Sequence, residues 1–217
     1  MGALIKNRQI DRICIIDDNE EFRLGLEDTV QESDFIPVSQ NERVDNLEMF
    51  LNDIVQINDA VVSDHQLKKK NYFPVNGAEV VYRCYERGIP SVLVTRYEPH
   101  IGEIRKFRKN IPVILNPEEF EPDTLYKSLE VCIDEFNGEI KPARKIWRSL
   151  VRIDSLDKNH IYVIIPSWDT NEIISLNIED LPEKMRSVIE PDLRLHAKVN
   201  IGCESANDLF FLDWETK

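Results

Sequence analysis

The sequence predicts an α/β protein in which a doubly wound parallel sheet is followed by a small, mostly-β, barrel-like domain. In residues 1–138, short apolar runs alternate with amphipathic helical segments, and this alternation occurs five times. The apolar runs are unbroken, which is typical of strands covered by helices on both faces. From residue 139 to 217 the pattern changes to short β-branched or aromatic runs, which indicates a second domain with a different architecture.

The first strand and helix show the pattern that the other pairs repeat. The apolar run 13–16 ends at two aspartates, and residues 20–32 then carry Phe22, Leu26 and Val30 at helical spacing. The later pairs are an edge strand at 35–38 with a helix at 44–54, 60–63 with 78–86, 91–94 with 101–107, and 112–115 with 123–136. Asn137-Gly138 and Pro142 then end the last helix, so we place the domain boundary near residue 140.

The second domain is predicted to hold several short strands and one short helix. The expected strands are 149–153, 161–165, 173–176, 195–201 and 209–211, and the expected helix is 180–186. Many short strands in so small a domain favour a barrel or a sandwich.

Composition and charge exclude several classes of protein. The 217 residues carry 27 basic and 40 acidic groups, so phosphate backbones and anionic lipids are poor partners. No apolar run approaches the roughly 20 residues of a spanning helix, and no signal-peptide pattern opens the chain, so we expect a cytoplasmic protein without membrane contact. The four cysteines lie far apart, which argues against a zinc site or a disulfide framework.

Polar residues with metal-binding or catalytic potential follow the predicted strands of the first domain. Asp17 and Asp18 come after the first strand, Asp64 after the third, Thr95 after the fourth and Asn116 after the fifth. Ligands of open parallel sheets bind beyond the carboxyl ends of the strands, so three carboxylates are expected to converge there. Like charges this close are costly without a cation, and oxygen ligands suit Mg²⁺. The alternative is that these acids serve only as helix caps and loop hydrogen-bond acceptors.

The same strand ends carry a family resemblance. Ile15-Ile16-Asp17-Asp18-Asn19, Val61-Val62-Ser63-Asp64-His65 and Val92-Leu93-Val94-Thr95 resemble a response-regulator receiver domain over about residues 10–138. The resemblance implies a five-stranded, flavodoxin-like sheet of order 2-1-3-4-5. It further implies that Asp17, Asp18 and Asp64 hold Mg²⁺ and that Asp64 accepts a phosphoryl group from a histidine kinase or a small phosphodonor. Thr95 would contact that phosphoryl group.

Three departures from the family pattern predict an atypical receiver. Asn116 stands before Pro117 where the family has a lysine, so a hydrogen-bond donor remains for the phosphoryl group but its positive charge is lost. Val113 replaces an aromatic residue found in many receivers. The segment 68–76 is long and contains Lys68-Lys69-Lys70, which either replaces the lost cation or forms a solvated loop. His65 beside the acceptor is read as packing or surface rather than as a phosphorelay residue.

The protein is therefore expected to act in signalling through protein–protein interaction. Either it is phosphorylated on Asp64, or it serves as a phosphorylation-independent scaffold. A more remote alternative is a metal-dependent phosphohydrolase, but no enzymatic activity is expected. The second domain lacks a basic recognition helix, so we predict a protein partner rather than DNA. Its three tryptophans, Trp147, Trp168 and Trp214, belong either to a binding patch or to the domain core.

Overall fold

A computed structural model describes residues 2–96 and 100–215 of the chain. The fold divides into two compact units, which are described separately below. The first unit takes in the described residues of 1–100 together with 110–139. The second takes in 140–215 together with 101–109.

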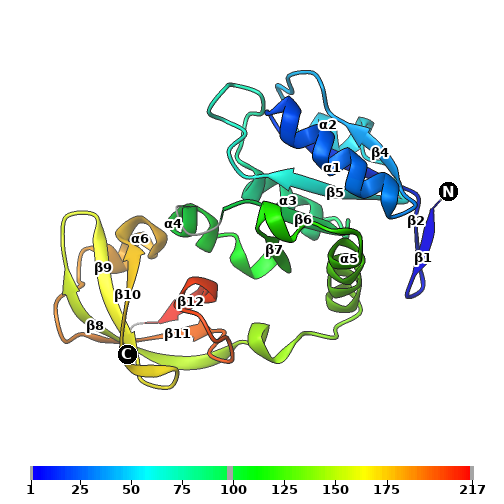
Figure 1. Ribbon diagram of the computed structural model, residues 1–217. Helices are drawn as coiled ribbons and strands as arrows, with labels where there is room; N and C mark the ends of the chain where they lie inside the picture. Colours follow the sequence, from blue (N-terminus) through cyan, green and yellow to red (C-terminus); the bar gives the residue numbers. More distant parts are fainter. Residues whose placement is uncertain (1, 97–99, 216–217) are drawn as a thin grey trace. The chain divides into compact units, whose positions relative to one another are not determined.

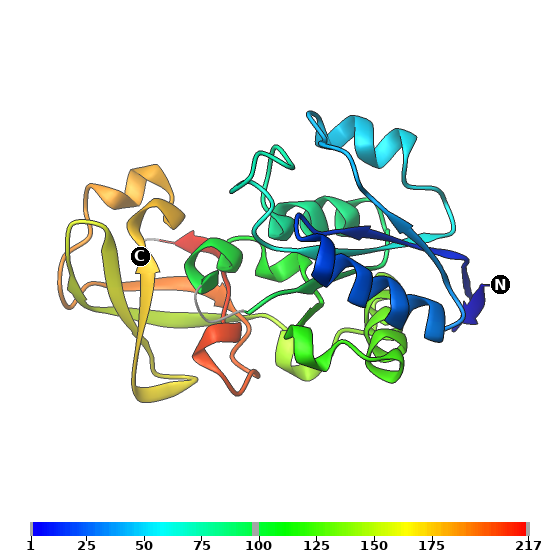
Figure 2. The ribbon, with the colours of Figure 1, turned by 45° about the horizontal axis from the view of Figure 1, so that its top comes forward.

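The first unit is built on a parallel sheet of five strands. The strands are β3 (Arg12–Ile16), β4 (Ile36–Ser39), β5 (Asp59–Asp64), β6 (Ser91–Val94) and β7 (Val113–Leu115). Their order across the sheet is β4-β3-β5-β6-β7, and every neighbouring pair is parallel (Figures 1 and 2). Counted along the sheet's own strands this is 2-1-3-4-5, so the predicted doubly wound, flavodoxin-like fold is confirmed.

Helices cover both faces of this sheet, as the unbroken apolar strands predict. One buried cluster joins α1 (Glu20–Glu32) and α5 (Pro122–Phe136) to one face, and another joins α2 (Leu47–Asp53) and α3 (Gly77–Glu86) to the opposite face. Along β3 the side chains alternate between the two clusters because successive residues of a strand point to opposite faces. Ile13 and Ile15 belong to the first cluster, and Cys14 and Ile16 to the second.

An antiparallel hairpin at the start of the chain was not predicted. It consists of β1 (Ala3–Ile5) and β2 (Arg8–Ile10), and its buried Ile5 and Ile10 join the same cluster as α5. Lys6 adopts a positive φ of 52° in the turn. The turn contains no glycine, so the usual sequence signal for such a hairpin is missing.

The second unit is an antiparallel sheet of five strands. They are β8 (Trp147–Leu156), β9 (His160–Ile165), β10 (Asp169–Asn177), β11 (Arg194–Val199) and β12 (Phe211–Glu215). The order is β10-β9-β8-β11-β12, which confirms a mostly-β region after the parallel sheet. The last strand begins later than predicted because Leu209 and Phe210 are buried in a loop that precedes it.

Short helical turns complete both units. The predicted helix at 180–186 is instead a 3₁₀ turn, η5 (Ile178–Asp180), followed by α6 (Glu183–Arg186). The remaining short elements are α4 (Ile101–Arg105), η2 (Arg108–Asn110), η3 (Pro117–Glu119), η4 (Pro142–Arg144) and η6 (Ala206–Asp208).

Residues 101–109, which the sequence analysis placed in the first domain, pack with the second unit. Arg105 is almost fully buried, and its guanidinium donates hydrogen bonds to the carbonyls of Ser175 at 2.6 Å and Ala206 at 3.1 Å. Arg108 is equally buried and pairs with Asp208 at 3.0 Å. A buried guanidinium requires acceptors, and these acceptors belong to the second unit.

The three tryptophans of the second unit differ in burial. Trp168 and Trp214 pack against the core of the unit, and Trp168 donates its indole N–H to the carbonyl of Cys203 at 2.7 Å. Trp147 is 56% exposed. The core interpretation therefore fits Trp168 and Trp214, whereas Trp147 remains available at the surface.

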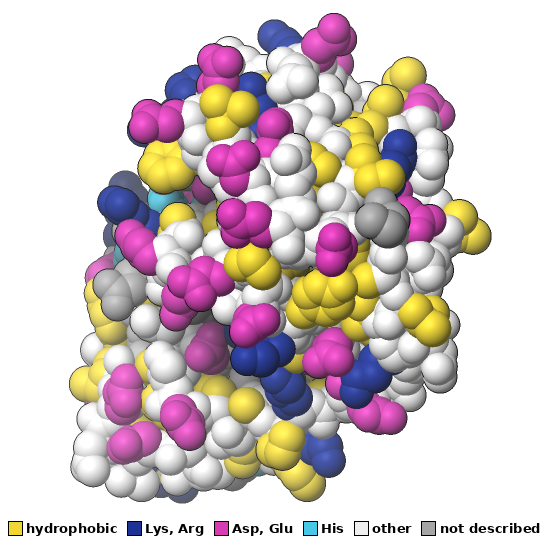
Figure 3. All heavy atoms as spheres, turned by 45° about the vertical axis from the view of Figure 1, so that its right-hand side comes forward, with side chains coloured by type: hydrophobic (Ala, Val, Ile, Leu, Met, Phe, Trp, Pro, Cys, Tyr) yellow, Lys and Arg dark blue, Asp and Glu magenta, His cyan; other side chains and the backbone are white. Residues whose placement is uncertain are grey.

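Charge is distributed unequally between the units. The first unit has 12 basic and 26 acidic residues in its sequence ranges, whereas the second has 15 and 14. Acidic side chains are accordingly more widespread than basic ones on the face shown in Figure 3. Among the described residues no helix combines the length and the apolarity that crossing a bilayer requires.

Candidate functional site

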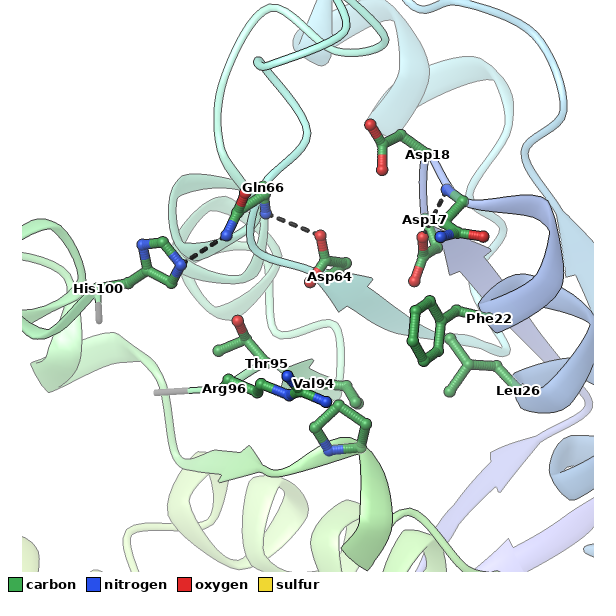
Figure 4. Close-up of a pocket in the computed structure, with 12 residues that line it drawn as sticks. Asp17, Asp18, Phe22, Leu26, Asp64, Gln66, Val94, Thr95, Arg96 and His100 are labelled. Carbon is green, nitrogen blue, oxygen red and sulfur yellow. Dashed lines mark hydrogen bonds between the residues drawn. The ribbon is translucent and has the colours of Figure 1, made fainter. Parts of the chain in front are cut away.

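Three carboxylates converge at the carboxyl ends of the parallel strands. Asp17 and Asp18 follow β3, and Asp64 is the last residue of β5. Their closest carboxylate oxygens all lie within 4.8 Å of one another. They line a pocket of about 290 Å³ together with Thr95, which follows β6 (Figure 4). The structure therefore brings together four of the five site residues expected from the sequence.

Local hydrogen bonds hold Asp17 in place. Its carboxylate accepts the backbone N–H of Asn19 at 2.7 Å, and the Asn19 side chain in turn caps α1 by accepting the N–H of Glu21 at 3.0 Å. Arg23, one turn into the helix, donates to the carbonyl of Asp17 at 2.8 Å. The helix is capped by Asn19, so Asp17 itself is available for another role.

Asp64 is held by the residues that follow it. Its carboxylate accepts the N–H of Gln66 at 2.8 Å, and a side-chain hydrogen bond joins Gln66 to His100 at 2.7 Å (Figure 4). Behind the strand, a Cβ added to Gly77 would lie 1.7 Å from the carbonyl oxygen of Asp64. Only glycine can begin α3 this close to the strand.

The electrostatics of the pocket favour a bound cation. Burial raises the pKa of Asp17 to about 6, the charges of Asp64 and Asp18 add to that shift, and the hydrogen bond from Asn19 opposes it. The pKa of Asp64 is also raised, first by burial and then by the charge of Asp18. Crowded and buried carboxylates are costly when ionised, and a hard divalent ion relieves that cost. The donor set therefore fits Mg²⁺, with Asp17, Asp18 and Asp64 as the protein ligands.

The two residues expected to contact a phosphoryl group lie in different surroundings. Thr95 is buried, and its backbone N–H donates to the carbonyl of Leu115 at 2.8 Å, so the residue is held at the pocket wall. Asn116 is exposed and is not among the described residues that line the pocket. Its backbone N–H donates to the Glu119 carboxylate at 2.9 Å. Val113 is half-buried against the core at the start of β7.

Two basic side chains at the site, Arg96 and Lys70, were not singled out from the sequence. Arg96, directly after Thr95, lines the pocket, and its side chain is 75% exposed (Figure 4). The ammonium of Lys70 lies 3.3 Å from the carboxylate of Asp18. A basic residue next to a strand-end threonine was the available signal for Arg96. The place of Lys70 depends on how its loop folds.

His65 is buried, in agreement with a packing role. Its ring lies 5.0 Å from that of His100, and its Nδ1 faces the backbone N–H of Ala78 at 3.4 Å.

Comparisons with known proteins find solved structures of similar fold. No protein-family model matches the chain, and no curated protein matches it. One similar structure is a response regulator receiver domain protein from Clostridium thermocellum, with 13% identity and a TM-score of 0.46 over 59% of this chain and 98% of that one. Another is the signal receiver domain of an HD domain-containing protein from Pseudomonas fluorescens Pf-5, with 15% identity and a TM-score of 0.44 over 60% and 91%. A third is the RcsB response regulator of Salmonella typhimurium, with 14% identity and a TM-score of 0.42 over 61% of this chain and 62% of that one.

Proposed function

We propose that the first unit is a signalling receiver that accepts a phosphoryl group on Asp64. The observation that carries this proposal is the convergence of the Asp17, Asp18 and Asp64 carboxylates within 4.8 Å, in a pocket that also contains Thr95. Burial raises the pKa values of two of these acids, Asp17 and Asp64. Strongly perturbed pKa values cluster at functional sites, where burial and neighbouring charges shift them.

The chemistry assigned to Asp64 is nucleophilic. One of its carboxylate oxygens forms a bond to the phosphorus of a phosphohistidine or of acetyl phosphate, and the bond from phosphorus to the donor breaks. The leaving imidazole takes up a proton, whereas the acetate leaves as an anion. A divalent ion held by the three acids supplies charge neutralisation when it is bound. The nucleophile is the ionised form of Asp64, and burial raises the pKa of this carboxyl, so protonation competes with the reaction as the pH falls.

Stabilisation of the transferred group falls to two neighbours of the acceptor. The Thr95 hydroxyl can donate one hydrogen bond to a phosphoryl oxygen. The guanidinium of Arg96, on the pocket wall, supplies positive charge that Asn116 cannot supply, and guanidinium groups suit phosphate oxygens. We therefore assign the phosphoryl contacts to Thr95 and Arg96, with Asn116 in a lesser role.

We further propose that the second unit is a non-enzymatic output that binds another protein. Its nearly balanced charge gives no attraction for a nucleic-acid backbone. The exposed Trp147 is a suitable anchor for a protein interface, because aromatic residues are enriched there. Upstream, the expected partner is a histidine kinase or another phosphodonor.

Intact-mass measurement with Mg²⁺ and acetyl phosphate tests the acceptor. The wild-type protein should gain the mass of one base-labile phosphoryl group. Asp64→Asn should gain none, because the nucleophile is gone. Asp34→Asn is a matched control: Asp34 is exposed and has a φ of 62°, which asparagine tolerates well, so this variant should be phosphorylated like the wild type.

A second candidate function is a phosphorylation-independent scaffold. The observation that favours it is the exposed position of Asn116 outside the pocket, together with the loss of the lysine charge. If the wild type gains no mass under conditions in which it binds Mg²⁺, the scaffold is the better account. Turnover of a phosphatase substrate such as p-nitrophenyl phosphate would instead contradict the non-enzymatic proposal and favour a phosphohydrolase.

A further inference from the structure

The loop after Asp64 is anchored at both of its ends. Leu67 is fully buried and Phe73 nearly so, and the N–H of Phe73 donates to the carbonyl of Leu67 at 3.3 Å. The Phe73 ring packs edge-on against Phe50 of α2, with the ring centres 5.2 Å apart. Two buried apolar side chains thus bracket the tip of the loop and hold it to the core.

The tip itself is shaped by backbone hydrogen bonds. Asn71 has a φ of 55°, and its N–H donates to the carbonyl of Lys68 at 2.9 Å, which closes a turn around the two intervening lysines. Tyr72 bonds across to the segment after β4: its hydroxyl donates to the carbonyl of Gln40, and its own carbonyl accepts the N–H of Val44 at 3.0 Å. The backbone on both sides of Lys70 is therefore held by the fold.

Lys70 makes two contacts with one member of the acid cluster. Its ammonium lies 3.3 Å from the Asp18 carboxylate and 3.3 Å from the Asp18 carbonyl oxygen. The Asp18 side chain is only 12% exposed, whereas that of Lys70 is 61% exposed. Within the described parts of the chain, Lys68 and Lys69 make no such ion pair and are exposed to solvent.

We propose that Lys70 is a tethered counter-ion that competes with a divalent cation for Asp18. This inference rests on the metal site of the proposed function. Without metal, the ammonium offsets part of the repulsion among the three acids. A divalent ion carries twice that charge and can be shared by all three carboxylates, so it releases the ammonium. Metal binding at the acceptor is thereby coupled to the exposure of a basic loop tip.

Metal affinity of matched variants tests the competition. Lys70→Met and Lys69→Met each remove one exposed positive charge from the same loop, but only the first removes the ion pair. Mg²⁺ titration by calorimetry, repeated with Mn²⁺ by electron paramagnetic resonance, should show Lys70→Met binding the metal about two- to five-fold more tightly than Lys69→Met, the range expected for releasing an exposed ion pair. Equal affinities, or weaker binding by Lys70→Met, would overturn the proposal.

Amine labelling gives a second readout on the unmodified chain. Reductive methylation followed by peptide mass spectrometry should show faster labelling of Lys70 when Mg²⁺ is added, with Lys69 unchanged. Unchanged labelling of Lys70 in a protein that binds Mg²⁺ would contradict the release of the ammonium. Absence of metal binding in the wild type and in both variants would overturn the metal site itself, and the Lys70 proposal with it.

Discussion

Asp17 and Asp64 in the first unit's pocket and Asp157 in the second unit are held in opposite ways. In the pocket, burial raises the pKa of Asp17 to about 6 and raises that of Asp64 as well. In the second unit, Asp157 accepts the N–H groups of Asn159 and His160, and these hydrogen bonds lower its pKa to about 2. The first arrangement costs stability when the acids are ionised, whereas the second gains it.

Asp213 of the second unit follows the same rule as Asp157. Asp213 pairs with Lys198 at 2.7 Å, and that contact lowers the pKa of the Asp213 carboxyl. Asp208 pairs with the buried Arg108. Carboxylates of this kind stabilise the fold when they are ionised. The pocket carboxylates are destabilised when ionised, and a bound cation would offset that cost. We therefore assign structural roles to Asp157, Asp208 and Asp213.

The largest expected effect is in the second unit, where Arg105→Met should remove a structural cation. Two carbonyls lose a charged donor, so the unit should be destabilised by about 2–4 kcal/mol. All three tryptophans lie in this unit, so urea unfolding followed by tryptophan fluorescence reports on it. The exposed neighbour Lys106→Met is the control, and equal midpoints for the two variants would refute the structural role of Arg105.

Asp17→Asn should stabilise the first unit, which is the opposite of the effect expected for Arg105→Met on the second. Removing a buried, crowded charge while keeping the acceptor for the Asn19 N–H should raise the free energy of unfolding by about 1–3 kcal/mol at pH 8 without divalent ions. Far-UV circular dichroism during urea unfolding measures it, since the longer helices lie in this unit. A destabilised variant would show that Asp17 is a structural acid like Asp157.

The stability of the metal-free protein should depend on pH because the pKa of Asp17 is raised. The pKa of Asp17 is higher in the folded chain than its ordinary value of 3.8, so folding penalises the ionised form. Its penalty is fully present above about pH 6 and is relieved as the pH falls toward 4. Between pH 7 and pH 5 the wild type should therefore gain stability relative to Asp17→Asn. A parallel pH response in the two proteins would contradict the raised pKa.

The smallest expected effect is that of Asp157→Asn in the second unit. Its lowered pKa means that the ionised form is stabilised by folding, so the variant should be slightly less stable at pH 7. This contribution is present above about pH 4 and is lost as the pH falls toward 2. Tryptophan fluorescence should resolve the shift against Glu172→Gln, an exposed acid of the same unit. A gain in stability would remove the contrast between the two units.

The parallel sheet and the acid cluster could be predicted from local patterns alone. Unbroken apolar runs determine strands that are covered on both faces, and the ends of parallel strands meet at one edge. That reasoning placed Asp17, Asp18, Asp64 and Thr95 together, as the structure does. The same reasoning placed Asn116 there, but the backbone after β7 turns into η3 and leaves its side chain exposed.

Contacts between residues distant in sequence were decided only by the tertiary structure. Local periodicity assigned 101–107 to the first domain, yet buried Arg105 and Arg108 find their acceptors some 70 to 101 residues later. In the same way, Lys70 meets Asp18 across 52 residues because Leu67 and Phe73 anchor its loop. A side chain's sequence neighbours determine its secondary structure, but the partner that satisfies its charge is chosen by the packing of the whole unit.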